Sequence, residues 1–184
     1  NNNNNNNNSL LQSEKYFSNV REELLEIFSF EKERTNAFLR EFDKIKNSTR
    51  KTCSVHLRRT DYVGLSDFHA NLCSTNYYQD AFELLNVEDM NLFVFTDDEV
   101  FSRAFVGAII PLDNIVFIDE DVPAPEAIYL QSFTDYSIIA NSSFSWWGAW
   151  LGKTKQAVVA PKYWFGPKGP TDTEDLYAEK WIKL

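Results

Sequence analysis

Short apolar runs alternate with helix-like segments over most of this chain, and this alternation limits the fold more than any other feature. Each apolar run is too short for a helix and leads into a stretch with helical spacing. The expected strands lie at 53–57, 91–95, 114–118, 136–140 and 157–160. The expected helices lie near 77–85, 98–105, 125–133 and 143–151. Such alternation predicts an α/β fold with a Rossmann-like parallel sheet and helices on both faces.

The first 50 residues have a different character. Residues 1–8 are all asparagine, which indicates a disordered low-complexity run or a filler for an unassigned segment. Residues 9–50 predict a helical connecting segment with helices at 10–30 and 31–45, followed by a Rossmann-like lobe at 51–184. Because the chain does not begin with methionine, we expect it to be part of a longer protein.

The bulk composition excludes some classes of function. The 27 acidic and 18 basic residues give a net charge of −9, which argues against a nucleic-acid partner. An anionic ligand would therefore need a local cluster of cations. The two cysteines lack the spacing of a metal site and predict free thiols in a reducing compartment. No apolar run approaches the about 20 residues of a transmembrane segment, and no signal peptide is recognised.

Polar clusters follow four of the expected strands. They occupy residues 58–61, 96–98, 119–121 and 141–143. Ligands of open parallel sheets bind at the carboxyl ends of the strands. Four polar clusters in such places predict one continuous binding rim.

The segment 140–151 joins an expected strand to an expected helix through small polar residues. Such residues cap helix N-termini, where partial positive charge favours anions. The polar side chains are predicted to contact a ligand; they are Asn141, Ser142, Ser143 and Ser145. Trp146 and Trp150 share a helix face and are predicted to pack in the core. Gly148 is expected to let this helix approach a neighbour closely.

The first strand ends in a pair of arginines. Arg58 and Arg59 offer planar guanidinium groups that fit phosphate oxygens, although a structural role with nearby carboxylates is the alternative. Side-chain alternation places His56 and Arg58 on the same face. His56 could be a base, a hydrogen-bond donor to phosphate or a core histidine. Asp61 could be a base, but bracing an arginine is favoured.

Two acidic clusters leave alternatives open. Asp97 and Asp98 could cap the next helix, or accept hydrogen bonds from a purine edge or from sugar hydroxyls. Asp119 and Asp121 are spaced like a D-x-D motif that holds a divalent metal. A solvated acidic loop is the favoured interpretation of that motif.

Three segments together resemble the alpha-1,2-fucosyltransferase family: 56–63, 95–98 and 139–151. Residues 12–17 and 160–165 are also similar to family segments, so the resemblance extends from Leu10 to the C-terminus. Thr60 stands where family members often have glycine. The Gly-rich N-terminal motif of the family is absent from this sequence.

The resemblance implies a GDP-fucose-dependent, inverting enzyme of the GT-B type, in which substrates bind between two Rossmann-like lobes. This chain looks like the donor-binding lobe. The implied reaction transfers L-fucose from GDP-fucose to the 2-hydroxyl of a galactose-terminated glycan acceptor, without a metal or another cofactor. The implied catalytic residues are Arg58, Asp61 and Asp67. The implied donor-binding residues are His56, Arg58, Arg59, Asp97, Asp98, Asn141, Ser142, Ser143, Phe144 and Ser145.

Two other functions stay open. One is a noncatalytic module that binds sugar nucleotides or glycans. The other is a metal-dependent nucleotide-sugar transferase built around Asp119 and Asp121. The expected location is the cytoplasm, either free or peripheral to a membrane. The Golgi lumen is the alternative if a missing N-terminal part carries an anchor.

Overall fold

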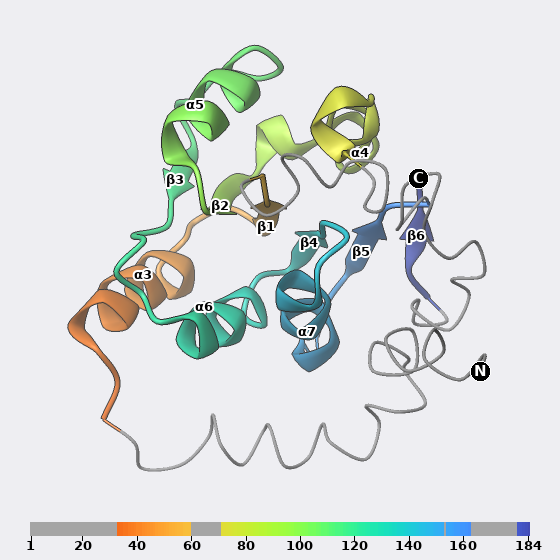
Figure 1. Ribbon diagram of the computed structural model, residues 1–184. Coiled ribbons are helices and arrows are strands. Elements are labelled where there is room, and N and C mark those ends of the chain that lie inside the picture. Colours follow the sequence, from red (N-terminus) through yellow and green to blue (C-terminus); the bar gives the residue numbers. More distant parts are fainter. Residues whose placement is uncertain (1–32, 60–70, 153, 163–179) are drawn as a thin grey trace, which may run out of the picture.

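The computed structural model describes residues 33–59, 71–152, 154–162 and 180–184. Within these residues six strands form one fully parallel sheet in the order β3-β2-β1-β4-β5-β6 (Figure 1). The strands are β1 Thr52–Leu57, β2 Asn91–Thr96, β3 Ile115–Phe117, β4 Tyr136–Ile138, β5 Ala157–Ala160 and β6 Ile182–Lys183. This is the strand order of the Rossmann fold, so the predicted fold class is confirmed.

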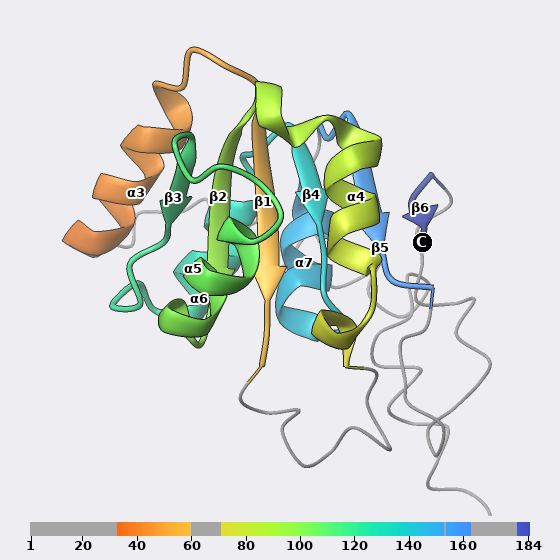
Figure 2. The ribbon, with the colours of Figure 1, turned by 90° about the horizontal axis from the view of Figure 1, so that it is seen from above.

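Helices cover both faces of the sheet. They are α3 Asn36–Lys46, α4 Tyr77–Leu85, α5 Glu99–Gly107, α6 Ala124–Gln131 and α7 Ser143–Leu151. Helices α4 and α5 lie on one face, and α3, α6 and α7 lie on the other (Figures 1 and 2). Two short 3-10 helices, Leu72–Ser74 and Val87–Asp89, flank α4.

The side chains of the strands pack into hydrophobic clusters on the two faces of the sheet. Val55 and Leu57 of β1 pack with α4, whereas Phe93 and Phe95 of β2 pack with α3 and α6. Every residue of β1 is buried, because this central strand is covered on both faces. His56 packs against Phe144 of α7, on the face opposite to Val55 and Leu57, so the side-chain alternation expected for β1 is confirmed.

The expected elements match the structure closely, and the differences lie at element ends and in one added strand. Helix α3 begins at Asn36 rather than at residue 31, because the Thr35 hydroxyl caps it by accepting the Phe38 N–H at 3.2 Å. Strand β6 was not predicted, since two residues carry no periodic signal. Strands β3 and β4 are shorter than the expected 114–118 and 136–140. The predicted helix at 10–30 and the asparagine run lie outside the described residues.

Helix α3 packs directly on the sheet. Its Phe38 and Ile45 belong to the same buried cluster as Phe93 of β2 and Leu130 of α6.

Both cysteines are free thiols, as the sequence predicts. Within the described ranges, no helix combines the length and the apolar character needed to cross a bilayer.

Helices α6 and α7 pack closely at Gly148. A Cβ atom at Gly148 would lie 2.6 Å from Cβ of Gln131 on α6, so only glycine permits this approach. Trp146 is fully buried beneath α7 and stacks on Trp150 with ring centroids 5.3 Å apart. The predictions for Gly148 and for both tryptophans are confirmed.

We expect Gly148→Ala to lower the free energy of unfolding by about 1–3 kcal/mol, because the new methyl group overpacks the α6–α7 contact. The matched control is Gly107→Ala at the end of α5, where the new Cβ would meet Leu112 at an ordinary 3.4 Å. This control should be neutral or stabilise by up to about 1 kcal/mol. Urea denaturation of both variants measures the difference, and equal stabilities would contradict the close-packing argument.

Candidate functional site

Strands β1 and β4 are neighbours in the sheet, yet their following helices leave to opposite faces. Helix α4 follows β1 on one face, and α7 follows β4 on the other. The two strands pair only as far as Val55 and Ile138, and their carboxyl ends then separate. In open α/β sheets, ligands bind in the crevice that such a switch point creates.

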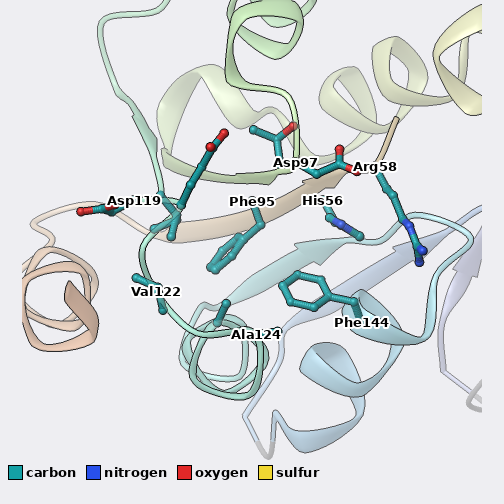
Figure 3. A pocket seen from close by; sticks show the side chains of 12 residues that line it. His56, Arg58, Phe95, Asp97, Asp119, Val122, Ala124 and Phe144 are labelled. Atoms are coloured by element: carbon teal, nitrogen blue, oxygen red, sulfur yellow. The ribbon is translucent and has the colours of Figure 1, made fainter. Parts of the chain in front are cut away.

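A pocket of about 560 Å³ opens along the carboxyl ends of β1, β2 and β3 (Figure 3). The first turns of α6 and α7 form its opposite wall. Its lining residues are His56, Arg58, Phe95, Thr96, Asp97, Ile118, Asp119, Glu120, Val122, Ala124, Ala127 and Phe144. In Figure 3, Arg58 lies at one end and Asp119 at the other, with Phe95 and Phe144 between them. The volume is in the usual range for small-molecule sites.

The cationic end is built across the switch point. Nη1 of Arg58 donates a hydrogen bond of 2.8 Å to the Ser142 hydroxyl. Ser142 is also the N-cap of α7, where its hydroxyl accepts the Phe144 N–H at 3.2 Å. A guanidinium group and the positive end of a helix dipole thus converge at one place. Such an arrangement suits an anion.

The turn before α7 is held together from inside. The fully buried Ser145 hydroxyl lies 3.1 Å from the Ala140 N–H and 3.3 Å from the Ala140 carbonyl oxygen. The structure therefore places the Ser145 side chain in the turn, whereas the Ser143 side chain is exposed to solvent. Asn141 is buried at the end of the strand. The predicted donor contacts of these three residues stay predictions.

His56 lines the middle of the pocket and is only 5% exposed. Its ring packs 4.8 Å from the Phe144 ring, and its Nδ1 atom has no hydrogen-bond partner among the described residues. Burial and, to a smaller extent, the Arg58 charge lower the pKa of His56 to about 3, and the charge of Asp97 opposes this shift. The imidazole is therefore neutral at physiological pH. It is a weak base, but it can form a hydrogen bond with a ligand.

Carboxylates lie along the rest of the pocket, with Asp97 near His56 and Asp119 at the end opposite Arg58 (Figure 3). Asp97 follows β2 and accepts the Arg59 N–H at 3.0 Å. Asp119 follows β3, is 3.4 Å from Arg40 of α3, and accepts the Asp121 N–H at 2.9 Å. Negative charge therefore extends from the middle of the pocket to the end opposite Arg58.

Arg59 and Asp98 do not line the pocket. The Arg59 guanidinium lies 3.7 Å above the Phe101 ring of α5 and 3.9 Å from the Asp98 carboxylate. Asp98 caps α5 by accepting the Phe101 N–H at 3.1 Å. The capping alternative for Asp98 is thus confirmed, and the two arginines lie apart. Asp61 and Asp67 lie outside the described residues, so their predicted roles stay predictions.

Sequence reasoning named Phe144 but missed the other apolar residues that line the pocket. Phe95 could have been found, because it pairs in register with His56 and alternation then places both on one face. Val122, Ala124 and Ala127 come from the turn and helix after β3, and no motif marks them.

Asp119 and Asp121, the candidate metal ligands of the D-x-D motif, already have partners within the protein. Asp119 and Asp121 are linked by the Asp121 N–H, and Asp119 also faces Arg40. Among the residues that the structure describes, no group of three or more His, Cys, Asp or Glu could hold a metal ion.

We expect His56 to make folding sensitive to acid. An unfolded histidine binds a proton below pH about 6.5, whereas folded His56 stays neutral down to about pH 3. The unfolded state therefore binds more protons in this window, and the free energy of unfolding falls by up to about 1.4 kcal/mol per pH unit as pH decreases. Denaturation of wild type and His56→Gln at several pH values isolates this contribution. Identical slopes would contradict a neutral, buried His56.

Comparison with known proteins identifies the family to which this chain belongs. The model of the family "Glycosyl transferase family 11" matches residues 1–184. An alpha-1,2-colitosyltransferase from Escherichia coli is 35% identical over 189 residues, which cover 94% of this chain and 60% of that protein. The O-antigen biosynthesis glycosyltransferase WbnK from Escherichia coli is 32% identical over 152 residues, which cover 78% of this chain and 48% of that protein. The chain thus spans 60% or less of the length of these relatives, and it belongs to glycosyl transferase family 11.

Proposed function

We propose that this protein transfers L-fucose from GDP-fucose to the 2-hydroxyl of a galactose-type acceptor, with inversion and without a metal. The hydrogen bond between Arg58 and Ser142 at the N-terminus of α7 is the observation that carries this proposal. It forms an anion site of the kind that a nucleoside diphosphate needs. Membership of glycosyl transferase family 11 supports a sugar-nucleotide donor.

The donor would lie along the pocket with its diphosphate at Arg58. The nucleoside would then extend between the apolar side chains Phe95 and Val122 toward the carboxylates. Asp97, near His56, would accept hydrogen bonds from sugar hydroxyls, whereas the two adjacent N–H donors of guanine match a carboxylate such as that of Asp119 at the far end. The neutral imidazole of His56 would supply a further hydrogen bond.

The chemical step needs help at the leaving group. As the bond between C1 of the sugar and the phosphate oxygen breaks, negative charge grows on GDP. Arg58 and the N-terminus of α7 would stabilise this charge, the task that a divalent metal performs in other transferases. One such fixed donor is typically worth about 3–4 kcal/mol.

The acceptor hydroxyl must lose its proton as it attacks C1 from the opposite side. His56, with a pKa of about 3, is poorly suited to accept this proton. The candidate bases are Asp61 and Asp67, or a residue outside this chain.

The transferred sugar has a second candidate. One relative is named for transfer of colitose through an alpha-1,2 linkage. Turnover assays with GDP-fucose and GDP-linked colitose, each with a galactose-terminated glycan, separate the two donors.

We expect Arg58→Ala in the intact enzyme to reduce kcat/KM for GDP-fucose by about 10²–10³ or more, because the developing charge loses a fixed donor. Arg103→Ala is the matched control, since Arg103 lies on α5 with its guanidinium over Phe117 and does not line the pocket. The control should keep its activity. Calorimetric titration with GDP and with GDP-fucose should show weaker binding by Arg58→Ala than by wild type and by Arg103→Ala. Near-normal activity of Arg58→Ala would overturn the phosphate assignment, and absence of GDP binding by wild type would overturn the proposed donor.

We also expect EDTA to leave the rate of sugar transfer unchanged, because the charge on the leaving group is met by Arg58 and α7. Assays with EDTA, and with added Mg²⁺ or Mn²⁺, measure this. A strict metal requirement would instead favour a metal role for Asp119 and Asp121.

A further inference from the structure

Two adjacent tyrosines at the start of α4 donate hydrogen bonds to the strand ends that carry the anion site. The Tyr78 hydroxyl donates to the His56 carbonyl oxygen at 2.7 Å. The Tyr77 hydroxyl lies 2.6 Å from the Ile139 carbonyl oxygen and 3.1 Å from that of Val159. Both side chains are buried on the face of the sheet opposite to the pocket.

These carbonyl groups lie where β1 and β4 separate. The register between the two strands ends at Val55 and Ile138, so His56 and Ile139 are each one residue beyond the last pair. Buried carbonyl groups need a donor, and the pairing of β1 with β4 does not extend to these residues, although the Ile139 N–H still donates to the Val159 carbonyl oxygen of β5 at 2.9 Å. The tyrosine hydroxyls supply that donor at both strand ends.

The hydroxyl groups themselves need an explanation. The two rings pack edge to face at 5.0 Å, and Tyr78 also packs against Phe105. Phenylalanine would keep this ring packing without the cost of burying a hydroxyl group. The hydroxyl groups therefore serve the hydrogen bonds to the strand carbonyls and are not needed for ring packing.

Both bonded carbonyls lie two or three residues before a residue of the anion site. Arg58 lies two residues after His56, and Ser142 lies three residues after Ile139. Their side chains meet at 2.8 Å across the gap. Fixing the two carbonyls from the opposite face therefore fixes the separation and direction of the two halves of the site.

We propose that Tyr77 and Tyr78 are positioning residues that hold Arg58 and the N-terminus of α7 at the spacing of a diphosphate. The inference rests on the proposed function for the identity of the ligand. The hydroxyls act through the backbone and do not touch the ligand. Misplacement of such a site by a fraction of an ångström weakens binding and catalysis.

The test compares Tyr77→Phe and Tyr78→Phe with Tyr136→Phe. Tyr136 is a matched control, because its hydroxyl donates to Gln156 at 2.7 Å from the opposite, amino end of β4. Amide hydrogen exchange of the unligated chain is measured first. We expect Tyr78→Phe to speed exchange at residues 57–59, and Tyr77→Phe at residues 140–144, by roughly fivefold, as for loss of one hydrogen bond. Residues 53–55 should be unchanged, and Tyr136→Phe should affect neither segment.

GDP affinity, measured by calorimetry, then connects position to binding. Each of Tyr77→Phe and Tyr78→Phe should weaken GDP binding by about fivefold, whereas Tyr136→Phe should leave it within about twofold of wild type. If Tyr78 acts through Arg58, adding Tyr78→Phe to Arg58→Ala should have no further effect. A purely structural loss would add in that background.

The outcomes separate the two proposals. If wild type binds GDP but the two variants match Tyr136→Phe in exchange and affinity, the positioning inference is overturned and the proposed function stands. If wild type does not bind GDP, the proposed function is overturned. The exchange rates at 57–59 and 140–144 then decide by themselves whether the tyrosines hold the strand ends.

Discussion

The hydrogen bond between Arg58 and Ser142 is the contact on which the site depends. It joins the ends of two neighbouring strands whose helices leave to opposite faces. Ser142 is a neutral acceptor, so this contact orients the guanidinium without neutralising its charge. The same hydroxyl caps α7, and the helix dipole is therefore directed at the same place. The strand order places the two strand ends side by side, side-chain alternation directs Arg58 into the pocket, and capping fixes the Ser142 hydroxyl.

Buried polar groups at the two ends of the sheet differ in whether they have hydrogen-bond partners. At the amino end, the Asp135 carboxylate accepts hydrogen bonds from the N–H and hydroxyl of Thr52. Lys155 donates to the carbonyl groups of Gln131, the last residue of α6, and of Thr134, and burial lowers the pKa of Lys155 to about 7. These groups are satisfied within the fold. At the carboxyl end, the buried Nδ1 of His56 lacks such a partner among the described residues, which marks this end as the one built to receive a ligand.

Much of this arrangement is predictable from sequence because it is local. Strand periodicity, the polar strand ends and the capping serines all lie within a few residues of the features they explain, and they predict the sheet and the Arg58–Ser142 end of the pocket. Alternation also implies that Arg58 and Arg59 diverge, although the arginine pair suggests one shared site. The wall from α6 depends on how a distant helix packs on β2, and the Tyr78 hydroxyl reaches His56 from another element. Such long-range contacts leave no pattern in the chain.

The aromatic residues of α7 explain why the anion site can be rigid. A fixed dipole stabilises developing charge without reorganising, but only if the helix that carries it cannot shift. Trp146 is fully buried, Trp150 stacks on it, and Gly148 brings α7 against Gln131 of α6. Tight packing of this kind resists displacement, because interior voids are small and side chains interlock. The tryptophans beside the polar turn therefore contribute to binding from a distance, by holding in place the helix end that Ser142 and Arg58 complete.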